Sequence, residues 1–62
     1  MSEYTFEIEY SDGSIEEYHT CAANKIMAYE MLTEYLGDFD IDPRKVTVNM
    51  IDVVHFSEEE NN

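Results

Sequence analysis

Three aspartates at alternate positions, Asp38, Asp40 and Asp42, resemble the opening of a calcium-binding loop, where oxygen ligands at positions 1, 3 and 5 surround the ion. The rest of the pattern departs from that loop. Position 6 is Pro43, where a glycine is needed for the sharp turn, and position 12 is Asn49, where a bidentate glutamate is required. We therefore predict no specific calcium site and expect the three carboxylates to point to solvent.

His19, Cys21 and His55 are the side chains that could bind a soft metal or take part in nucleophilic catalysis. They lack the short paired spacings and the fourth ligand of a structural zinc site. A nucleophile needs an adjacent base and an orienting third group, and the sequence has no glycine-rich elbow or phosphate loop to hold such a set. We predict a protein that is not an enzyme and that uses no metal or cofactor. The lone cysteine is expected to be buried.

Charge is the strongest feature of the composition, with fifteen Asp and Glu against three Lys and Arg and a formal net charge of −12 over 62 residues. This balance argues against direct binding to nucleic acid or to an anionic membrane, and it favours a basic partner approached by electrostatic steering. High solubility alone is the simpler interpretation and stays open. No apolar run approaches the roughly 20 residues that span a bilayer, so we expect a cytoplasmic protein.

A predicted β-hairpin positions many of these carboxylates. Residues 4 to 10 alternate apolar and polar side chains, and residues 14 to 20 form a second strand-like stretch. A two-residue Asp12-Gly13 turn would direct Glu17 and His19 to the core. A three-residue loop over residues 11–13, with left-handed Gly13, would instead set Tyr18 opposite the apolar face of the first strand.

We favour the three-residue loop because it buries the tyrosine and exposes the charges. It leaves one face of the hairpin with Thr5, Glu7, Glu9, Ile15, Glu17 and His19. Glu7 then lies directly opposite Glu17, and like charges in that position destabilise a sheet.

A helix is predicted from about Ala22 to Leu36, with Thr20 as its N-cap and Gly37 as its left-handed stop. The expected sheet-facing stripe is Ala22, Ile26, Tyr29, Leu32 and Leu36. A second apolar stripe, Met27, Met31 and Tyr35, widens the apolar arc beyond what one small sheet covers. We predict that this second stripe is the interface of a homodimer, because a core of this size is marginal on its own.

Residues 37–43 are predicted to form a loop, followed by a strand over 46–56 whose alternation changes phase near Met50-Ile51, which indicates a bulge. The order ββαβ predicts an α+β fold with a mainly antiparallel three-stranded sheet in the order 2-1-3 and one helix on one face. Residues 1–56 are expected to form a single domain, and 57–62 an acidic flexible tail.

The distribution of the acidic residues is more informative than their number, because residues 1–20, which include the hairpin, contain no Lys or Arg. Side chains two apart on a strand lie about 6.6 Å from each other, so Glu7 and Glu9 form a regular carboxylate row with Glu17 beside it. A phosphate backbone is also a regular negative row, and a groove lined for phosphates would meet this surface with similar electrostatics. We therefore put forward DNA mimicry as a hypothesis. Glutamates that prevent edge-to-edge aggregation are the simpler alternative.

The stretches YTFEIEYSDGSIEEY, AANKIMAYEMLTEYLG and DFDID together resemble the small, acidic, phage-encoded proteins that mimic DNA, in particular Bacillus-phage inhibitors of the nucleoid protein HU. That resemblance implies a homodimer that blocks DNA binding by occupying the DNA-binding surface of HU. It implies partner contacts through Glu7, Glu9, Asp12, Glu16, Glu17, Asp38, Asp40 and Asp42. The alternative is a phage protein-interaction module that acts by sheet-edge or hydrophobic contact, for example on host RNA polymerase.

Overall fold

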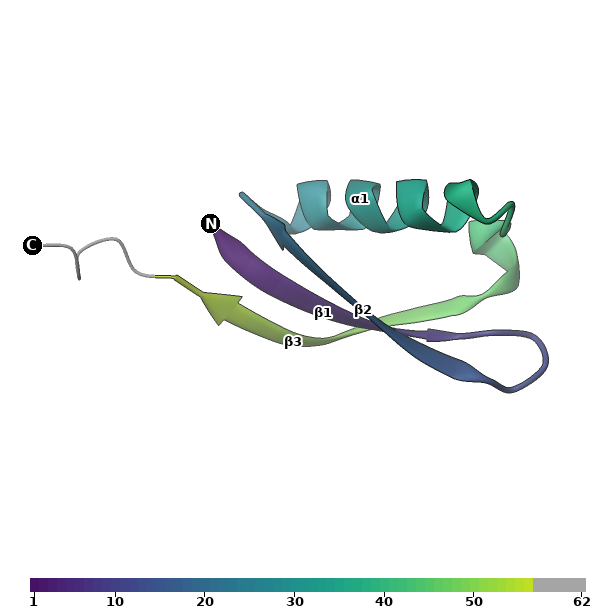
Figure 1. Cartoon of the computed structure of the whole chain (residues 1–62). Coiled ribbons are helices and arrows are strands. Elements are labelled where there is room, and N and C mark those ends of the chain that lie inside the picture. Colours follow the sequence, from purple (N-terminus) through teal and green to yellow (C-terminus); the bar gives the residue numbers. More distant parts are fainter. Residues whose placement is uncertain (57–62) are drawn as a thin grey trace, which may run out of the picture.

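The computed structural model describes residues 1–56, which form a three-stranded antiparallel sheet covered on one face by a helix (Figure 1). The elements in chain order are β1 (Ser2–Glu9), β2 (Ile15–Ala22), α1 (Lys25–Asp38), the short 3-10 helix η1 (Pro43–Lys45) and β3 (Thr47–His55). The sheet order is β2-β1-β3, so the predicted ββαβ topology is confirmed. The predicted acidic tail, 57–62, lies outside the described residues.

A three-residue loop joins β1 to β2, as predicted. The amide of Tyr10 donates to the carbonyl of Ser14 at 2.9 Å, and the amide of Gly13 donates back to the carbonyl of Tyr10 at 2.9 Å. Gly13 has a φ of 90°, a left-handed conformation that favours glycine. The resulting register sets Phe6 opposite Tyr18 and fixes which side chains face the helix.

The core lies between the helix-facing side of the sheet and α1. Its buried residues are Tyr4, Phe6, Ile8, Ala22, Ala28, Leu32 and Leu36. The ring of Phe6 lies 4.9 Å from that of Tyr29 and 6.4 Å from that of Tyr18. Burial of each large side chain contributes about 1.5–3 kcal/mol. These few residues are what hold the sheet and the helix together.

The predicted start of the helix was wrong. Asn24 is the N-cap, with its side-chain oxygen accepting from the amide of Met27 at 2.9 Å. Thr20 is still part of β2, opposite Tyr4, and its hydroxyl donates to the sulfur of Met31 at 3.3 Å. Because β1 begins at Ser2, the pairing of the two strands continues to Ala22 and delays the helix.

The stripe of α1 that faces the sheet is also narrower than predicted. It consists of Ala28, Leu32 and Leu36, spaced four residues apart. Ile26 was expected on this stripe but is 71% exposed. At 100° per residue it lies about 120° around the helix from Leu32, outside the arc that the sheet covers. Tyr29, also expected on this stripe, is at its edge, because its ring contacts Phe6 and its side chain is still 40% exposed.

The helix continues through Gly37 and ends at Asp38, so the predicted stop at Gly37 was wrong. The left-handed residue is Asp40, with a φ of 59°. The amide of Asp40 donates to the carbonyl of Gly37 at 3.0 Å, and the amide of Ile41 donates to that of Leu36 at 2.9 Å. This pair of bonds is a Schellman motif, and it turns the chain back toward η1 and β3.

The bulge predicted in β3 is confirmed. Phe6 pairs with Met50 and Thr5 with Asp52, so Ile51 is the extra residue between them. The bulge restores the alternation of β3 to the phase of β1, which leaves Val53 facing the helix and Asp52 facing away from it. In this register the acidic side chains of β1 and Asp52 of β3 lie on the face away from the helix, and most of the large apolar side chains of the sheet lie on the other face.

Candidate functional site

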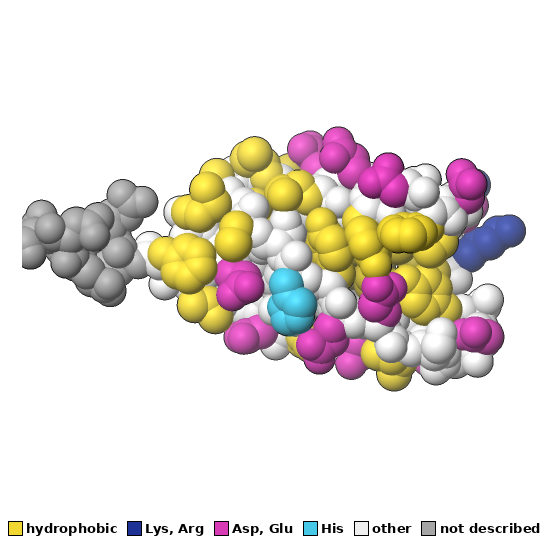
Figure 2. Space-filling view, in the orientation of Figure 1, with side chains coloured by type: hydrophobic (Ala, Val, Ile, Leu, Met, Phe, Trp, Pro, Cys, Tyr) yellow, Lys and Arg dark blue, Asp and Glu magenta, His cyan; other side chains and the backbone are white. Residues whose placement is uncertain are grey.

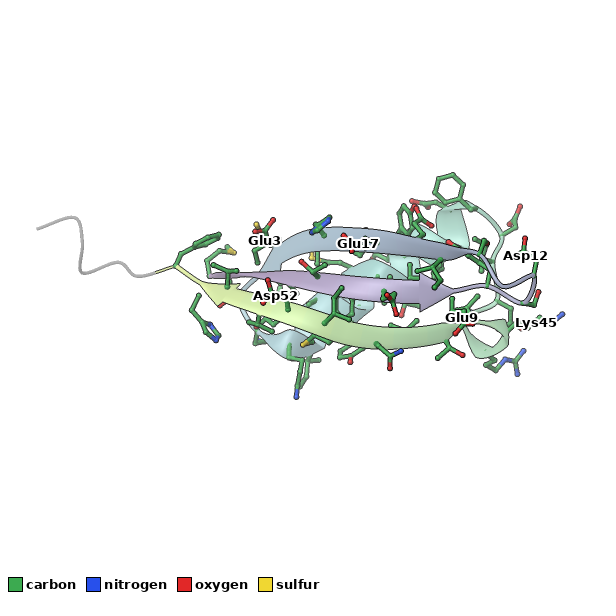
Figure 3. The ribbon with its side chains drawn as sticks, turned by 90° about the horizontal axis from the view of Figure 1, so that it is seen from below. Glu3, Glu9, Asp12, Glu17, Lys45 and Asp52 are labelled. Atoms are coloured by element: carbon green, nitrogen blue, oxygen red, sulfur yellow. The ribbon has the colours of Figure 1, made fainter. Side chains whose placement is uncertain are left out.

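The face of the sheet opposite α1 is not covered by any element of residues 1–56, and we call it the outer face (Figure 1). Side chains from all three strands form cross-strand rows on it. From one end to the other, written β2–β1–β3, the rows are Ile15–Glu9–Thr47, Glu17–Glu7–Asn49, His19–Thr5–Asp52 and Cys21–Glu3–Val54. Figure 3 views this face directly and labels four of its acids.

The outer face carries carboxylates of Glu3, Glu7, Glu9, Glu17 and Asp52. Within residues 1–56, no Lys or Arg belongs to these rows. Glu7 and Glu17 lie directly opposite each other, as predicted. Since Tyr10 and Ser14 form a hydrogen-bonded pair, the Glu7–Glu17 pair is a non-hydrogen-bonded one, with Cα atoms about 4.5 Å apart. The two like charges are therefore held close together.

His19 connects two outer-face residues. Its Nδ1 lies 3.0 Å from the hydroxyl of Thr5, and its Nε2 lies 3.5 Å from a carboxylate oxygen of Glu17. A hydroxyl, an imidazole and a carboxylate in this order resemble a nucleophile with its base and orienting acid. The side chains of His19 and Glu17 are 53% and 58% exposed, however, and an effective triad needs a buried acid. We assign the group a solvated structural role.

Asp12 lies at the tip of the hairpin, at one end of the outer face (Figure 3). Its Oδ1 accepts from the amide of Ser14 at 2.9 Å and from the hydroxyl of Ser14 at 2.7 Å. These bonds, chiefly the one from the hydroxyl, hold the pKa of Asp12 below its usual value. The fixed negative charge extends the acidic outer face past the ends of the strands.

The three aspartates of the calcium-like pattern occupy different structural positions. Asp38 ends α1, Asp40 is the left-handed residue, and Asp42 caps η1. Asp42 also accepts two bonds from the Arg44 guanidinium, Nε–Oδ1 at 3.1 Å and Nη2–Oδ2 at 3.0 Å, which lower its pKa and offset its charge. Over the described part of the chain, no three His, Cys, Asp or Glu side chains are placed to hold a metal ion together.

Glu16 was predicted at the same surface as Glu7 and Glu17, and the structure separates it from them. It faces the helix side of β2, where the hydroxyls of Tyr10 and Tyr35 both donate to its carboxylate. These bonds lower the pKa of Glu16 and raise the pKa of Tyr10 to about 12. They also raise the pKa of Tyr35. Alternation places Glu16 inside because β2 continues unbroken from Ile15.

The predicted dimer stripe is uneven in its exposure. Met27 is 45% exposed and Met31 is 37% exposed, while Tyr35 is half-buried. The ring of Tyr35 lies 4.6 Å from that of Tyr18, and the Tyr18 hydroxyl donates to the carbonyl of Met31 at 3.4 Å. Tyr35 and Met31 are therefore partly engaged by the sheet, and Met27 is the member most available to a second chain.

Two outer-face acids, Glu3 and Asp52, were missing from the predicted site, and Cys21 was predicted to be buried but is exposed. Because β1 begins at Ser2, the alternation of its side chains places Glu3 on the same face as Glu7 and Glu9. The bulge at Ile51 changes which side chains of β3 face outward, and it places Asp52 on the outer face. Cys21 faces outward because β2 continues past it, and Ala22 takes the buried position instead.

Across residues 1–56, no helix is long and apolar enough to cross a membrane. Comparison with known proteins found no matching family, no similar curated protein and no similar solved structure.

Proposed function

We propose that this protein inhibits a basic DNA-binding protein by occupying its DNA-binding surface in place of DNA, with the nucleoid protein HU as the target. The observation that carries the proposal is the single-signed outer face, where carboxylates lie on all three strands and no Lys or Arg shares the rows among residues 1–56. A surface that serves only solubility can mix charges of both signs and so avoid repulsion between like charges. A single-signed surface creates a field that steers a basic partner.

The placement of Glu7 opposite Glu17 supports the same proposal. Like charges directly opposite each other on a sheet cost stability, typically about 0.2–1 kcal/mol. Replacing either residue with Gln or Thr would remove this cost and keep the face polar. A binding role that needs both charges gives a reason for the pair.

The partner contacts are assigned first to Glu7, Glu9 and Glu17, with Glu3 and Asp52 beside them and Asp12 at the tip. Asp38 and Asp40 are secondary candidates, because they lie at the end of α1 and not on the outer face. Asp42 contributes least, since Arg44 already pairs with it. A protein that acts on HU works in the cytoplasm of the host cell.

Competition for DNA tests the proposal directly. Labelled duplex DNA bound to HU is titrated with this protein at low salt, and a molar excess should release the DNA in a gel-shift assay. The double variant Glu7→Gln/Glu17→Gln should compete at least about tenfold less well, since each close charge pair at such interfaces contributes on the order of 1.5 kcal/mol or more.

The matched control is Glu30→Gln/Glu34→Gln, which removes the same net charge from exposed positions of α1. It should compete nearly as well as the unaltered protein. Equal losses in the two variants would indicate that only total charge matters. Failure of the unaltered protein to release DNA at any excess would refute the proposal.

A second candidate function is an interaction module that works by sheet-edge or hydrophobic contact, for example on host RNA polymerase. It is favoured by two features, the position of β2 and β3 as edge strands and the exposure of Ile26 and Met27 on α1. Charge reversal at Glu7, Glu9 and Glu17 separates the two functions. DNA mimicry predicts lost binding to the target, and edge or hydrophobic recognition predicts little change.

A further inference from the structure

Glu16 is a carboxylate on the helix side of the sheet, where the neighbouring positions of β1 and β2 are mostly apolar or aromatic. A half-buried acid in such surroundings requires hydrogen-bond partners. Glu16 has two, because the hydroxyls of Tyr10 and Tyr35 donate to different oxygens of its carboxylate. Its lowered pKa keeps it ionised at neutral pH. The result is a fixed negative charge held by two phenol groups.

A pocket of about 300 Å³ opens beside this carboxylate, lined by Tyr10, Glu16, Tyr35, Phe39 and Ile41. The Tyr35 and Phe39 rings meet edge to face, with centroids 5.2 Å apart. Phe39 is 62% exposed, so this aromatic wall stands open to solvent. Figure 2 shows hydrophobic side chains at the surface between acidic side chains on the helix side and others on the sheet side. The pocket therefore combines aromatic walls with one charge.

No cation from residues 1–56 neutralises Glu16. In this part of the chain Arg44 pairs with Asp42, and His19, which carries a charge only when protonated, lies beside Glu17. Each carboxylate oxygen has two lone pairs, and each tyrosine hydroxyl uses one of them. Glu16 thus keeps acceptor capacity and has no counter-charge from the described residues, which favours a cation supplied from outside.

We propose that this pocket binds the guanidinium group of an arginine side chain from a partner protein. A guanidinium is planar, stacks on aromatic rings and presents a fork of N–H donors that matches a carboxylate. The walls Tyr35 and Phe39 supply the stacking surface, and Glu16 accepts from the fork. The pocket volume of about 300 Å³ is at the small end of the range for ligand sites and is large enough for one side chain. This site lies on the helix side of the sheet and is independent of the outer face.

Titration with a small probe tests the proposal without any partner protein. N-acetyl-arginine methylamide is added to the isotopically labelled full chain, and the ring signals of Tyr10, Tyr35 and Phe39 are followed by NMR. Saturable shifts confined to these rings are expected. The citrulline analogue has the same shape without the charge, and it should bind roughly tenfold more weakly, since it loses the cation–π and charge-assisted contacts. Equal binding of the two probes would overturn the proposal.

Variants of the pocket provide the second test. Phe39→Ala removes the exposed wall and leaves the Tyr–Glu–Tyr hydrogen bonds intact, so it should fold and bind the arginine probe at least about fivefold more weakly. Glu16→Gln should also weaken binding, and its spectrum shows whether the fold persists. Glu30→Gln removes one charge from an exposed position of α1 outside the pocket, and it should bind the arginine probe as the unaltered protein does.

Unchanged binding by Phe39→Ala would overturn the proposal, as would an equal loss in Glu30→Gln, which would indicate attraction to net charge alone. A lysine analogue that binds as tightly as the arginine probe would overturn the assignment to guanidinium. Because the probe is a single amino-acid derivative, these outcomes do not depend on whether the outer face binds HU.

Discussion

Glu7 and Glu17 are the residues at which folding and the proposed binding make opposite demands. Their charges face each other across β1 and β2 with no Lys or Arg in the same row. Glu16, one residue from Glu17, is stabilised instead by two tyrosine hydroxyls. Neighbouring glutamates therefore have different environments because the strand directs alternate side chains to opposite faces.

Replacing Glu7 with Gln should stabilise the fold by about 0.2–1 kcal/mol, because it removes the repulsion from Glu17 and keeps the side-chain volume. Thermal and urea unfolding measure this change. Glu9→Gln is the control, since Glu9 lies between Ile15 and Thr47 and has no charge directly opposite it. An equal gain in both variants would assign the effect to net charge and not to the Glu7–Glu17 pair.

The Tyr10–Glu16–Tyr35 group should make stability depend on pH at both extremes. The pKa of Tyr10 is raised from 10.0 to about 12. Its hydrogen bond therefore contributes fully below pH 10 and is lost as the pH rises toward 12. Glu16 has a pKa below 4.5, so its contribution is present above pH 4.5 and is lost as the pH falls through the lowered value.

Unfolding curves of the unaltered protein and of Tyr10→Phe, measured across both ranges, test this dependence. The variant should be less stable near neutral pH, and the difference between the two proteins should shrink toward each extreme. A difference that stays constant at all pH values would contradict the linkage. Titration of the Tyr10 ring signal by NMR gives an independent value for its pKa.

At the scale of elements, the strands and their faces could be predicted because alternation and turn chemistry are local properties. The choice of the Ser11-Asp12-Gly13 loop fixed the register, and the phase change at Ile51 fixed the bulge. The start of the helix could not be predicted, since both Thr20 and Asn24 are good N-caps. The length of β1 decides between them, because its pairing with β2 holds Thr20 in the sheet.

Some residues of the candidate site could likewise be predicted from local sequence, and others could not. Glu7, Glu9 and Glu17 follow from the hairpin alone. The role of Glu16 does not, because it depends on Tyr35, which reaches it from a different element. The predicted sheet-facing stripe was wrong because Ile26 and Tyr29 fit the helical period as well as Ala28 does. Only the position of the helix on the sheet shows that Ala28 is buried and Ile26 is not.

Asn24→Ala should lower the free energy of unfolding by about 1 kcal/mol, because it removes the side-chain acceptor for the amide of Met27. Chemical unfolding measures the loss, and helix content by circular dichroism should fall slightly. Asn24→Asp is the control, since aspartate caps equally well and should preserve most of the stability. Loss in both variants would show that the amide group acts in some other way.

The predicted homodimer is tested at α1. Met27 is exposed. Among the hydrogen bonds of residues 1–56 it takes part only through its backbone, so a charged side chain at this position would break none of them. Met27→Glu should therefore weaken self-association by at least about tenfold, because a charge in an apolar interface is costly. Sedimentation velocity over a range of concentrations measures the change. Thr33→Glu is the control on the same helix, at an exposed polar position.

Met31→Glu should also weaken association, but it additionally removes the sulfur that accepts from Thr20. It therefore tests the stripe less cleanly than Met27→Glu. A monomer at micromolar concentration in the unaltered protein would rule out the dimer prediction. Unaltered association in Met27→Glu would move the interface elsewhere, for example to the edge strands β2 and β3.

At the scale of the whole molecule, the net charge of −12 acts against the fold and in favour of a basic partner. The three cations do little to balance the outer face. Arg44 pairs with Asp42, Lys25 begins α1, and Lys45 lies at one end of the molecule (Figure 3). Self-repulsion among the acids is therefore spread over the whole surface, and dissolved ions can reduce it.

Salt should accordingly change stability and binding in opposite directions. Between about 20 mM and 300 mM NaCl the Debye length falls from roughly 20 Å to about 6 Å, which screens repulsion between carboxylates of the same chain. The melting temperature should rise over this range. The affinity for a basic partner should fall over the same range, because the same ions screen the attraction that steers the complex. Differential scanning fluorimetry and calorimetric titration measure the two effects.

In the Glu7→Gln/Glu17→Gln variant both slopes should be shallower, since the closest like-charge pair is gone. Affinity and stability that rise together with salt would contradict an electrostatic origin for both, and would favour hydrophobic association through α1.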